Sequence, residues 1–378
     1  MEAEERPLRT KAWFRERFGR AQGVAVLLLL ILCLQVMWLS IHTPLSAPEL
    51  DYTVAGTSTG DAPVALSPVT VWAGRLAIWA PHFKQGEPHW SMRLPALIVG
   101  LLLGASLWYV ARRLYGNAGG YLALFLYTFS PVTISYCARL EPEIIVAWGV
   151  FGCVFTAIAV AHTLYAPREV VLWNWKRILL LGVAIGVGAG ARLSALIAVP
   201  VGLAFMLYLV PGRRRAAVAI MGAGTAVGIL VFALFHGLHG RNMLADAIHT
   251  GLNHPVWNEI IHGTVWKTVG LMVLGDGPGF AFLLLLALAV LIAWRRARYF
   301  GNFAPLLAAA LMIVFGIVFP NGAGPIFLVV AFPFLFLFIA GIWADLLQSS
   351  QSSLALGIVL AAGVMQAYFN VVGLLGVH

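Results

Sequence analysis

The chain has 378 residues, of which 61% are hydrophobic and 10% are charged, and its mean hydropathy is +0.90. This composition excludes a soluble globular domain, because too few polar residues are present to cover its surface. The formal net charge of +9 does not indicate a nucleic-acid partner, since Lys and Arg stand in short clusters at the ends of apolar runs. That arrangement is typical of a polytopic membrane protein.

The chain begins with a basic polar segment, residues 1–20, which we expect in the cytoplasm. An apolar run from Gly23 to Ile41 follows, and it is long enough to span a bilayer at about 1.5 Å per residue. A cleaved signal peptide is the alternative, because the small residues Ser46 and Ala47 come soon after the run. We favour an uncleaved first span, since the run is long for the core of a signal peptide.

Ten further apolar runs follow, so the sequence predicts an all-α membrane protein with about eleven transmembrane helices. These runs cover residues 93–111, 118–136, 143–164, 178–192, 193–210, 215–236, 277–294, 302–319, 325–346 and 353–375. The sequence therefore divides into the N-terminal segment 1–20, a transmembrane core over 21–290 and C-terminal transmembrane helices over 291–378.

The positions of the charges predict the orientation. With the N-terminus inside, 17 of the 24 Lys and Arg residues fall in interior segments, and every interior loop except the last obeys the positive-inside rule. The remaining seven fall outside: Arg75, Lys84, Arg93, Arg139, Arg192, Arg241 and Lys267. Nine of the 15 acidic residues and nine of the 10 His also fall outside. We therefore expect the function on the exterior face, in the long loops 42–92 and 237–276.

The first exterior loop opens with two carboxylates, Glu49 and Asp51, just beyond a membrane span. Charges are rare in so apolar a chain and indicate a functional loop. Later in this loop, Ser67–Trp79 has apolar residues at helical spacing, which predicts an interfacial helix that walls a cavity at the membrane surface. The alternative is that Trp72 and Trp79 only anchor the chain at the interface.

The second exterior loop is rich in histidine. It contains His236, His239, His249, His254 and His262, together with Asp246 and Glu259. Imidazole and carboxylate ligands suit zinc or iron, so a divalent metal is one interpretation. However, no HExxH or similar spacing occurs, and we therefore expect solvated histidines or histidines such as His249 and His254 that contact an acceptor.

Glycines at 182, 186 and 190 superficially suggest a phosphate-binding loop. Their spacing of four within an apolar run instead favours close helix packing. The cysteines, Cys33, Cys137 and Cys153, lie in or beside apolar runs without a CxxC spacing, so they indicate neither a metal site nor a disulfide.

Charged residues also stand at the edges of the apolar runs, where they are costly without a partner. Arg139, Glu141 and Glu143 follow the third span, and Arg192 interrupts a glycine-rich run. One interpretation is an ion pair between helices, such as Glu143 with Arg192. The other is that these charges converge on a polar or anionic group at the membrane surface.

In their order along the chain, these features resemble the type C membrane glycosyltransferases (GT-C), and more narrowly the bacterial relatives of the protein O-mannosyltransferases and of the lipid A aminoarabinose transferase. The first span, the acidic motif at Glu49 and Asp51 and the interfacial helix begin the pattern. The motifs that continue it are RLP at 93–95, RRLYG at 112–116, SPVTISYCARLEPEIIVAW at 130–148 and LGVAIGVGAGARLSALIAVP at 181–200. The resemblance covers residues 20–290.

The resemblance implies an inverting transfer of a sugar from a polyprenyl phosphate to an acceptor hydroxyl on a lipid, glycan or protein. Asp51 would be the general base, with Glu49 in reserve, because an acceptor hydroxyl needs a carboxylate to take its proton. Arg93, Arg139 and Arg192 would bind the donor phosphate, and Glu143 would orient one of these arginines or the acidic loop. No cofactor and no nucleic acid are expected. The partners would be membrane lipids and other membrane proteins.

The same resemblance predicts a bacterial inner-membrane protein with a periplasmic or extracellular active face. Two departures stand out. Family members often have a lysine followed by paired prolines after the acidic loop, where this chain has Leu66, Ser67, Pro68 and Val69, and Glu143 stands where Asp is common. The chain ends at His378, just after its last apolar run, so we expect no C-terminal soluble domain.

Two other classes of function are alternatives to a glycosyltransferase. A catalytically degenerate member of this fold would act as a structural subunit of a larger membrane complex. A lipid or solute transporter would need internal repeats and polar residues at mid-membrane in several helices, and the sequence shows neither.

Overall fold

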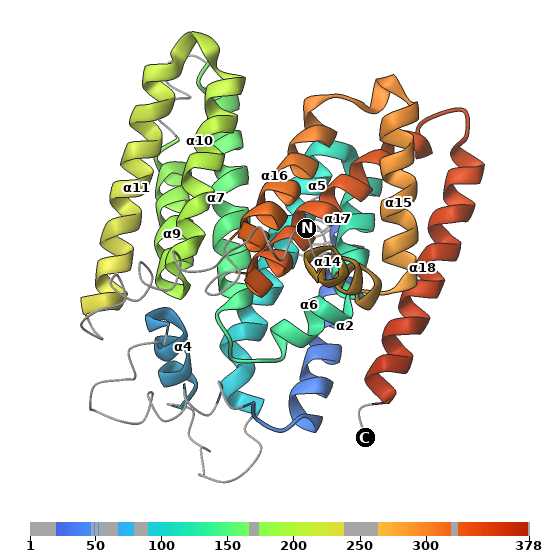
Figure 1. Ribbon diagram of the computed structural model, residues 1–378, viewed down its shortest axis with the longest axis horizontal. Coiled ribbons are helices and arrows are strands. Elements are labelled where there is room, and N and C mark those ends of the chain that lie inside the picture. Colours follow the sequence, from blue (N-terminus) through green and yellow to red (C-terminus); the bar gives the residue numbers. More distant parts are fainter. Residues whose placement is uncertain are drawn as a thin grey trace, which may run out of the picture.

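The computed structural model describes residues 20–46, 49, 52, 67–78, 90–165, 174–237, 264–318 and 324–376. Within these ranges every element is a helix, as predicted. In Figure 1, α5, α7 and α17 stand in the middle of the bundle, α9, α10 and α11 lie on one side, and α15 and α18 lie on the other.

The helices differ widely in length. The α-helices are α2 (Arg20–His42), α4 (Pro68–Ile78), α5 (Leu94–Thr128), α6 (Pro131–Cys137), α7 (Glu143–Thr163), α9 (Trp175–Ala191), α10 (Ala198–Leu209), α11 (Arg214–Gly237), α14 (Thr264–Gly275), α15 (Pro278–Ala293), α16 (Phe300–Val318), α17 (Gly324–Leu347) and α18 (Ser352–Leu375). Four short 3-10 helices join them: η1 (Trp90–Arg93), η2 (Leu193–Ile197), η3 (Pro211–Arg213) and η4 (Arg295–Ala297).

The predicted number of eleven membrane spans is not confirmed. Seven helices in the described ranges are long and apolar enough to cross a bilayer, and an eighth span is counted if α14 and α15, bent by 118° at their joint, form one broken span. Each of the eleven predicted runs does contain helix. The count is lower because α9, α10 and α15, with 17, 12 and 16 residues, are short, and because two predicted runs overlap the single helix α5.

α5 is a hairpin of two helical segments joined at Gly116. Gly116 has φ +76°, a left-handed value that glycine adopts readily. Beyond Gly116 the chain folds back on itself. This brings Tyr127 next to Gly100, and the Tyr127 hydroxyl donates to the Gly100 carbonyl at 2.7 Å. A methyl group at Gly120 would lie 3.0 Å from the Cβ of Arg112, which shows how closely the two segments pack.

The core of the bundle is α17. The apolar stretch of α17 within Phe327–Leu347 is completely buried. A helix that is apolar on every side is expected to be surrounded by other helices, and α17 is. Phe334 on α17 packs against Phe151 and Phe155 on α7, with ring centroids 5.4 and 5.7 Å away.

Glycines bring α7, α9 and α11 close together, which confirms the predicted role of the glycine-rich run. A methyl group at Gly149 on α7 would lie 2.6 Å from the Cα of Gly188 on α9. Likewise, a methyl group at Gly186 would lie 2.6 Å from the carbonyl oxygen of Gly228 on α11. Only glycine allows such backbone contact between helices.

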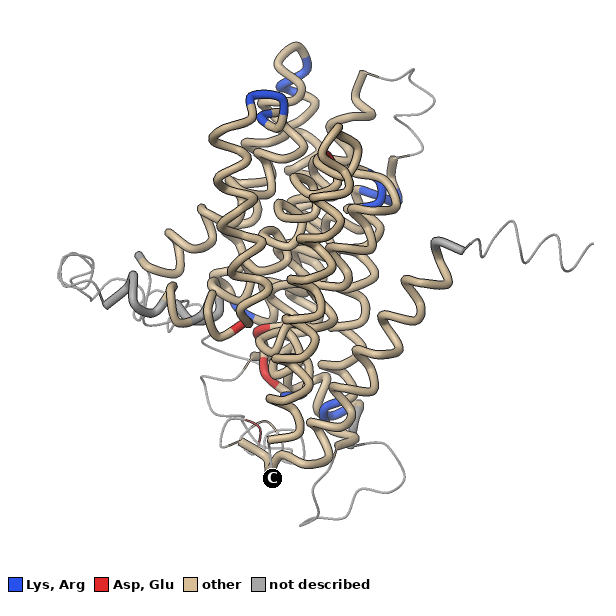
Figure 2. The backbone as a smooth tube through the Cα atoms, turned by 90° about the vertical axis from the view of Figure 1, so that its right-hand side faces the viewer, with Lys and Arg blue, Asp and Glu red and all other residues tan. Residues whose placement is uncertain are grey.

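Charges separate toward the two ends of the bundle. Figure 2 shows most of the basic segments gathered at one end, while most of the acidic segments lie with other basic segments toward the opposite end. Arg213 contacts the Leu164 carbonyl, and Tyr208 stacks on Phe300, so the loops after α7, α10 and α15 meet at the first end, which we call the basic end. The end where α2, η1 and the α6–α7 junction meet is called the site end. Which end faces the cytoplasm stays a prediction.

Candidate active site

The site end is organised around a buried ion pair between Arg93 and Glu49. Arg93 closes η1 directly before α5 and is 2% exposed, while Glu49 is fully buried. The guanidinium binds the carboxylate in a bidentate manner, with Nε to Oε1 and Nη2 to Oε2 both at 2.8 Å. Arg93 therefore joins the start of α5 to the acidic loop.

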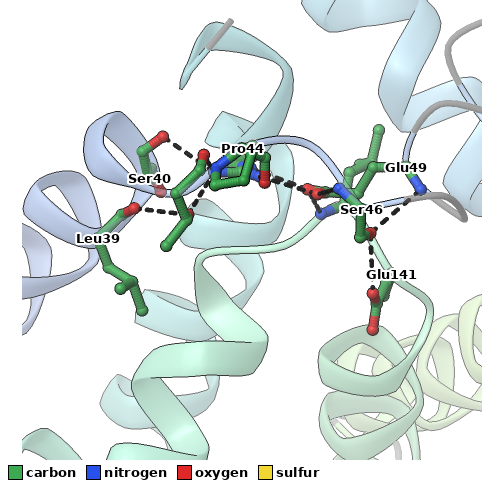
Figure 3. A network of polar contacts seen from close by, with 9 residues as sticks. Leu39, Ser40, Pro44, Ser46, Glu49 and Glu141 are labelled. Carbon is green, nitrogen blue, oxygen red and sulfur yellow. Dashed lines mark hydrogen bonds and ion pairs between the residues drawn. The ribbon is translucent and has the colours of Figure 1, made fainter. Parts of the chain in front are cut away.

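The remaining donors of Arg93 bind the end of α2 and the residues that follow it. Nη1 donates to the carbonyls of Ser40 and Thr43 at 2.9 and 3.0 Å and to the Thr43 hydroxyl at 2.8 Å, and Nη2 donates to the Pro44 carbonyl at 2.9 Å. Figure 3 shows this network. Since a guanidinium has five N–H groups, protein acceptors occupy all of them. We call Arg93 and these partners the Arg93 clamp.

Glu49 also accepts two backbone hydrogen bonds. The Ser46 amide donates to Oε2 at 2.8 Å, and the Leu140 amide donates to Oε1 at 2.9 Å. Burial alone would raise the pKa of Glu49, but the hydrogen bonds from Arg93, Ser46 and Leu140 and the Arg93 charge lower the pKa below its ordinary value of 4.5. Glu49 is thus ionised and fixes three segments of the chain in place.

The lowered pKa of Glu49 predicts a pH-dependent stability. The folded protein binds this proton less readily than the unfolded chain, so the stabilisation is present above the ordinary pKa of 4.5 and is lost as the pH falls through the lowered pKa. We expect Glu49→Gln to lower the Tm of the detergent-purified protein most at neutral pH, and the difference from wild type to shrink as the pH is lowered below 4.5. The same Tm difference at both pH values would contradict this role for Glu49.

Glu141 lies beside this pair. The Ser46 hydroxyl donates to its Oε1 at 3.4 Å, a long contact that connects the acidic loop to the α6–α7 junction (Figure 3). Burial raises the pKa of Glu141, the Arg139 charge opposes this rise, and the Glu49 charge adds to it. Arg139 itself is exposed, so it is available to an anion from outside.

Glu143 and Arg192 face each other across α7 and the end of α9 without an ion pair. Each acts electrostatically on the other, but the salt bridge found among the described residues is the one between Arg93 and Glu49. Arg192 ends α9 in an extended conformation, with φ −159° and ψ 129°, and is half-buried. Burial raises the pKa of Tyr52 to about 12, and the charges of Glu143 and Arg192 also act on this tyrosine. The predicted ion pair between Glu143 and Arg192 is therefore not formed.

α4 covers the end of α9 next to Arg192. It begins one residue after Ser67, whose hydroxyl donates to the Gly190 carbonyl at 3.2 Å, and a methyl group at Gly190 would lie 2.6 Å from Val69. This confirms a helix within Ser67–Trp79. α4 and η2 both contact α9, and in the described ranges each carries a buried polar atom with no hydrogen-bond partner: Trp72 Nε1 on α4 and Ser194 Oγ on η2.

Glu143 Oε2 is a third such atom. An unsatisfied buried polar atom is costly, so these three groups are suited to a ligand rich in hydroxyl or phosphate oxygens. Sequence reasoning had not identified Trp72 or Ser194 as site residues. Ser194 follows Arg192 by two positions, which was the available signal for it.

Several predicted site residues lie outside the described ranges, namely Asp51, His249 and His254. The histidine-rich part of the second exterior loop lies outside them as well. Where side chains are described, no three His, Cys, Asp or Glu residues lie close enough to hold a metal ion. The structure thus brings together Glu49, Arg93, Glu141, Glu143 and Arg192 at the site end, with Arg139 exposed beside them.

Residues 67–236 match the family model of the dolichyl-phosphate-mannose-protein mannosyltransferases, which covers less than half of the chain. The match includes α4, the α6–α7 junction and Arg192. No curated protein matches the sequence significantly.

Solved membrane-protein structures are similar over nearly the whole chain. The archaeal oligosaccharyltransferase AglB from Archaeoglobus fulgidus, in complex with an inhibitory peptide and a dolichol-phosphate, has a TM-score of 0.68 at 14% identity, over 96% of this chain and 56% of that chain. ArnT from Cupriavidus metallidurans bound to undecaprenyl phosphate has a TM-score of 0.64 at 16% identity, over 94% of this chain and 71% of that chain. The chain thus spans little more than half the length of AglB. At these identities the similarity is one of fold.

Proposed function

We propose that this integral membrane protein, which has the fold of the type C membrane glycosyltransferases and is related to the protein mannosyltransferases and ArnT, transfers a sugar from a polyprenyl phosphate to an acceptor hydroxyl. The observation that carries the proposal is the arrangement of charged and polar groups at the site end. There the acidic loop is clamped beside Glu143 and Arg192, and three buried polar atoms have no hydrogen-bond partner among the described residues. The dolichol-phosphate of the AglB complex and the undecaprenyl phosphate of the ArnT complex support a lipid phosphate as the ligand class.

The general base in this proposal is Asp51. It stands between Glu49 and Tyr52, both of which are buried at the site end. Asp51 takes the proton of the acceptor hydroxyl, the acceptor oxygen bonds to the anomeric carbon, and the bond from that carbon to the phosphate oxygen breaks with its electrons leaving on the phosphate. Attack opposite the leaving phosphate inverts the anomeric centre.

The arginines divide into two roles. Arg192 and Arg139 bind the leaving phosphate, since arginine donates paired hydrogen bonds to phosphate oxygens. Arg93 and Glu49 instead hold the acidic loop in position, because the Arg93 donors are occupied within the protein. Glu143 orients Arg192 electrostatically across the site. The reaction takes place on the exterior, periplasmic or extracellular face.

Arg192→Gln tests the donor site. Removing a charged hydrogen-bond donor should weaken binding of a polyprenyl phosphate to the purified protein by at least about tenfold. Arg215→Gln is the matched control, because Arg215 is exposed at the basic end. Binding is measured with undecaprenyl phosphate by native mass spectrometry.

Two outcomes would reject the proposed enzyme. The first is a wild-type protein that neither binds polyprenyl phosphates nor uses their sugar derivatives as donors. The second is a protein that copurifies stoichiometrically with a membrane complex whose assembly and activity are unchanged by Asp51→Asn and Arg192→Gln, which would identify a structural subunit instead.

A further inference from the structure

A second candidate site lies at the basic end, far along the bundle from the Arg93 clamp. A cavity of about 320 Å³ opens there between α10 and α16. Its inner walls are apolar, with Val201 and Leu311 among them, and its outer end carries Arg298, Tyr208 and Tyr299. We propose that this slot binds one anionic phospholipid, with its phosphate at Arg298 and an acyl chain between α10 and α16.

The slot is open to the bilayer along one face of α16. Phe303, Leu307 and Leu311 line it at intervals of four residues, so they stand above one another on the helix. They remain 51%, 38% and 40% exposed, which leaves their outer sides to lipid. Phe303 and Leu311 are eight positions apart, so the apolar path runs for about 12 Å, inward from the basic end. An amphiphile with one charged end fits this direction.

Arg298 is held at the mouth of the slot. Its Nε donates to the Leu291 carbonyl at 2.8 Å and its Nη2 donates to the Ile292 carbonyl, so the guanidinium is fixed against the last turn of α15. Within the described ranges its Nη1 makes no hydrogen bond, and the side chain is exposed. A fixed guanidinium with a remaining donor suits a phosphate oxygen. Tyr208, stacked on Phe300 at 5.5 Å, forms the facing wall.

The surrounding charge favours an anionic headgroup over a zwitterionic one. Arg295 and Arg296 are exposed on η4, directly before Arg298. The acidic residue described nearby, Asp345, accepts hydrogen bonds from the Tyr299 hydroxyl at 3.2 Å and from Asn302 Nδ2 at 2.7 Å. A basic pocket between membrane helices attracts anionic lipid headgroups.

Filling the slot tests the proposal. Ala204 is an exposed slot residue on α10, and Ala204→Trp places an indole where the acyl chain would lie. Ala219→Trp is the matched control, because Ala219 is also exposed, on α11 near the same end. The full chain is delipidated in detergent and given phosphatidylglycerol or phosphatidylcholine with identical acyl chains. Native mass spectrometry then measures the fraction of protein that retains one lipid.

We expect wild type and Ala219→Trp to retain phosphatidylglycerol in preference to phosphatidylcholine, and Ala204→Trp to lose this preference. Arg298→Gln should weaken phosphatidylglycerol binding about fivefold, while Arg214→Gln, at an exposed position outside the slot, should change it less. Equal retention by the two Trp variants would overturn the proposal. So would equal retention of the two lipids by wild type.

Discussion

Arg93→Met is expected to destabilise the folded protein by about 3–5 kcal/mol, the usual cost of removing one partner from a buried ion pair. The variant leaves the Glu49 carboxylate buried with two backbone amides but without its counter-charge. It also removes the donors to the carbonyls of Ser40 and Pro44. The loss is measured as the change in unfolding free energy during denaturant titration of the purified protein.

Two further variants identify the source of this loss. Arg139→Met removes a charge from an exposed arginine at the same end of the bundle, so it should cost less than about 1 kcal/mol. Combining Arg93→Met with Glu49→Leu removes both charges and should recover part of the stability. A destabilisation by Arg93→Met no larger than that by Arg139→Met would show that the clamp does not hold the fold together.

Asp51→Asn is expected to lower the rate of sugar transfer by about 10²–10⁴-fold, the usual contribution of a general base. The amide has nearly the same shape as the carboxylate but cannot take the acceptor proton, so the expression level and Tm should stay at their wild-type values. Transfer is followed with a polyprenyl-phosphate sugar donor. The control is Asp61→Asn, which changes a second aspartate of the same exterior loop.

The affinity for the donor separates catalysis from binding. If Asp51 is the base, its variant should retain the wild-type affinity for undecaprenyl phosphate, whereas Arg192→Gln should lose it. An active Asp51→Asn protein would exclude Asp51 as the base. Glu143→Gln would then be the next variant to measure, because Glu143 lies at the site end with a buried carboxylate oxygen that has no partner in the described ranges.

The helices and the packing of the glycine-rich run could be predicted from sequence, since both follow from local patterns. Apolar runs predicted helix at every position where the structure has a long one, and the four-residue glycine spacing predicted close helix packing, which the structure shows between Gly186 and Gly228. The number of spans could not be predicted equally well. A single positive φ at Gly116 decides whether two apolar runs belong to one helix or to a hairpin, and composition does not determine that angle.

The candidate site was predictable only in part. The acidic loop, Glu141, Glu143 and Arg192 were expected at one face, and the described residues among them do lie at one end of the bundle. The partner of Arg93 was not predictable. A phosphate, a carboxylate and a set of carbonyls all satisfy a guanidinium, and the choice depends on the Leu140 amide and the chain after α2 being brought to the same place.

The Arg93 clamp also constrains the order of events during synthesis. Glu49 is translated 44 residues before Arg93 and 91 residues before Leu140. At about 5–20 residues per second, the ribosome delivers the arginine about 2–9 s after the carboxylate. During that interval the new acidic segment must stay hydrated, since it has no counter-charge with which to enter a dry environment. The loop therefore reaches its final position only after the nascent chain has extended past the third apolar run.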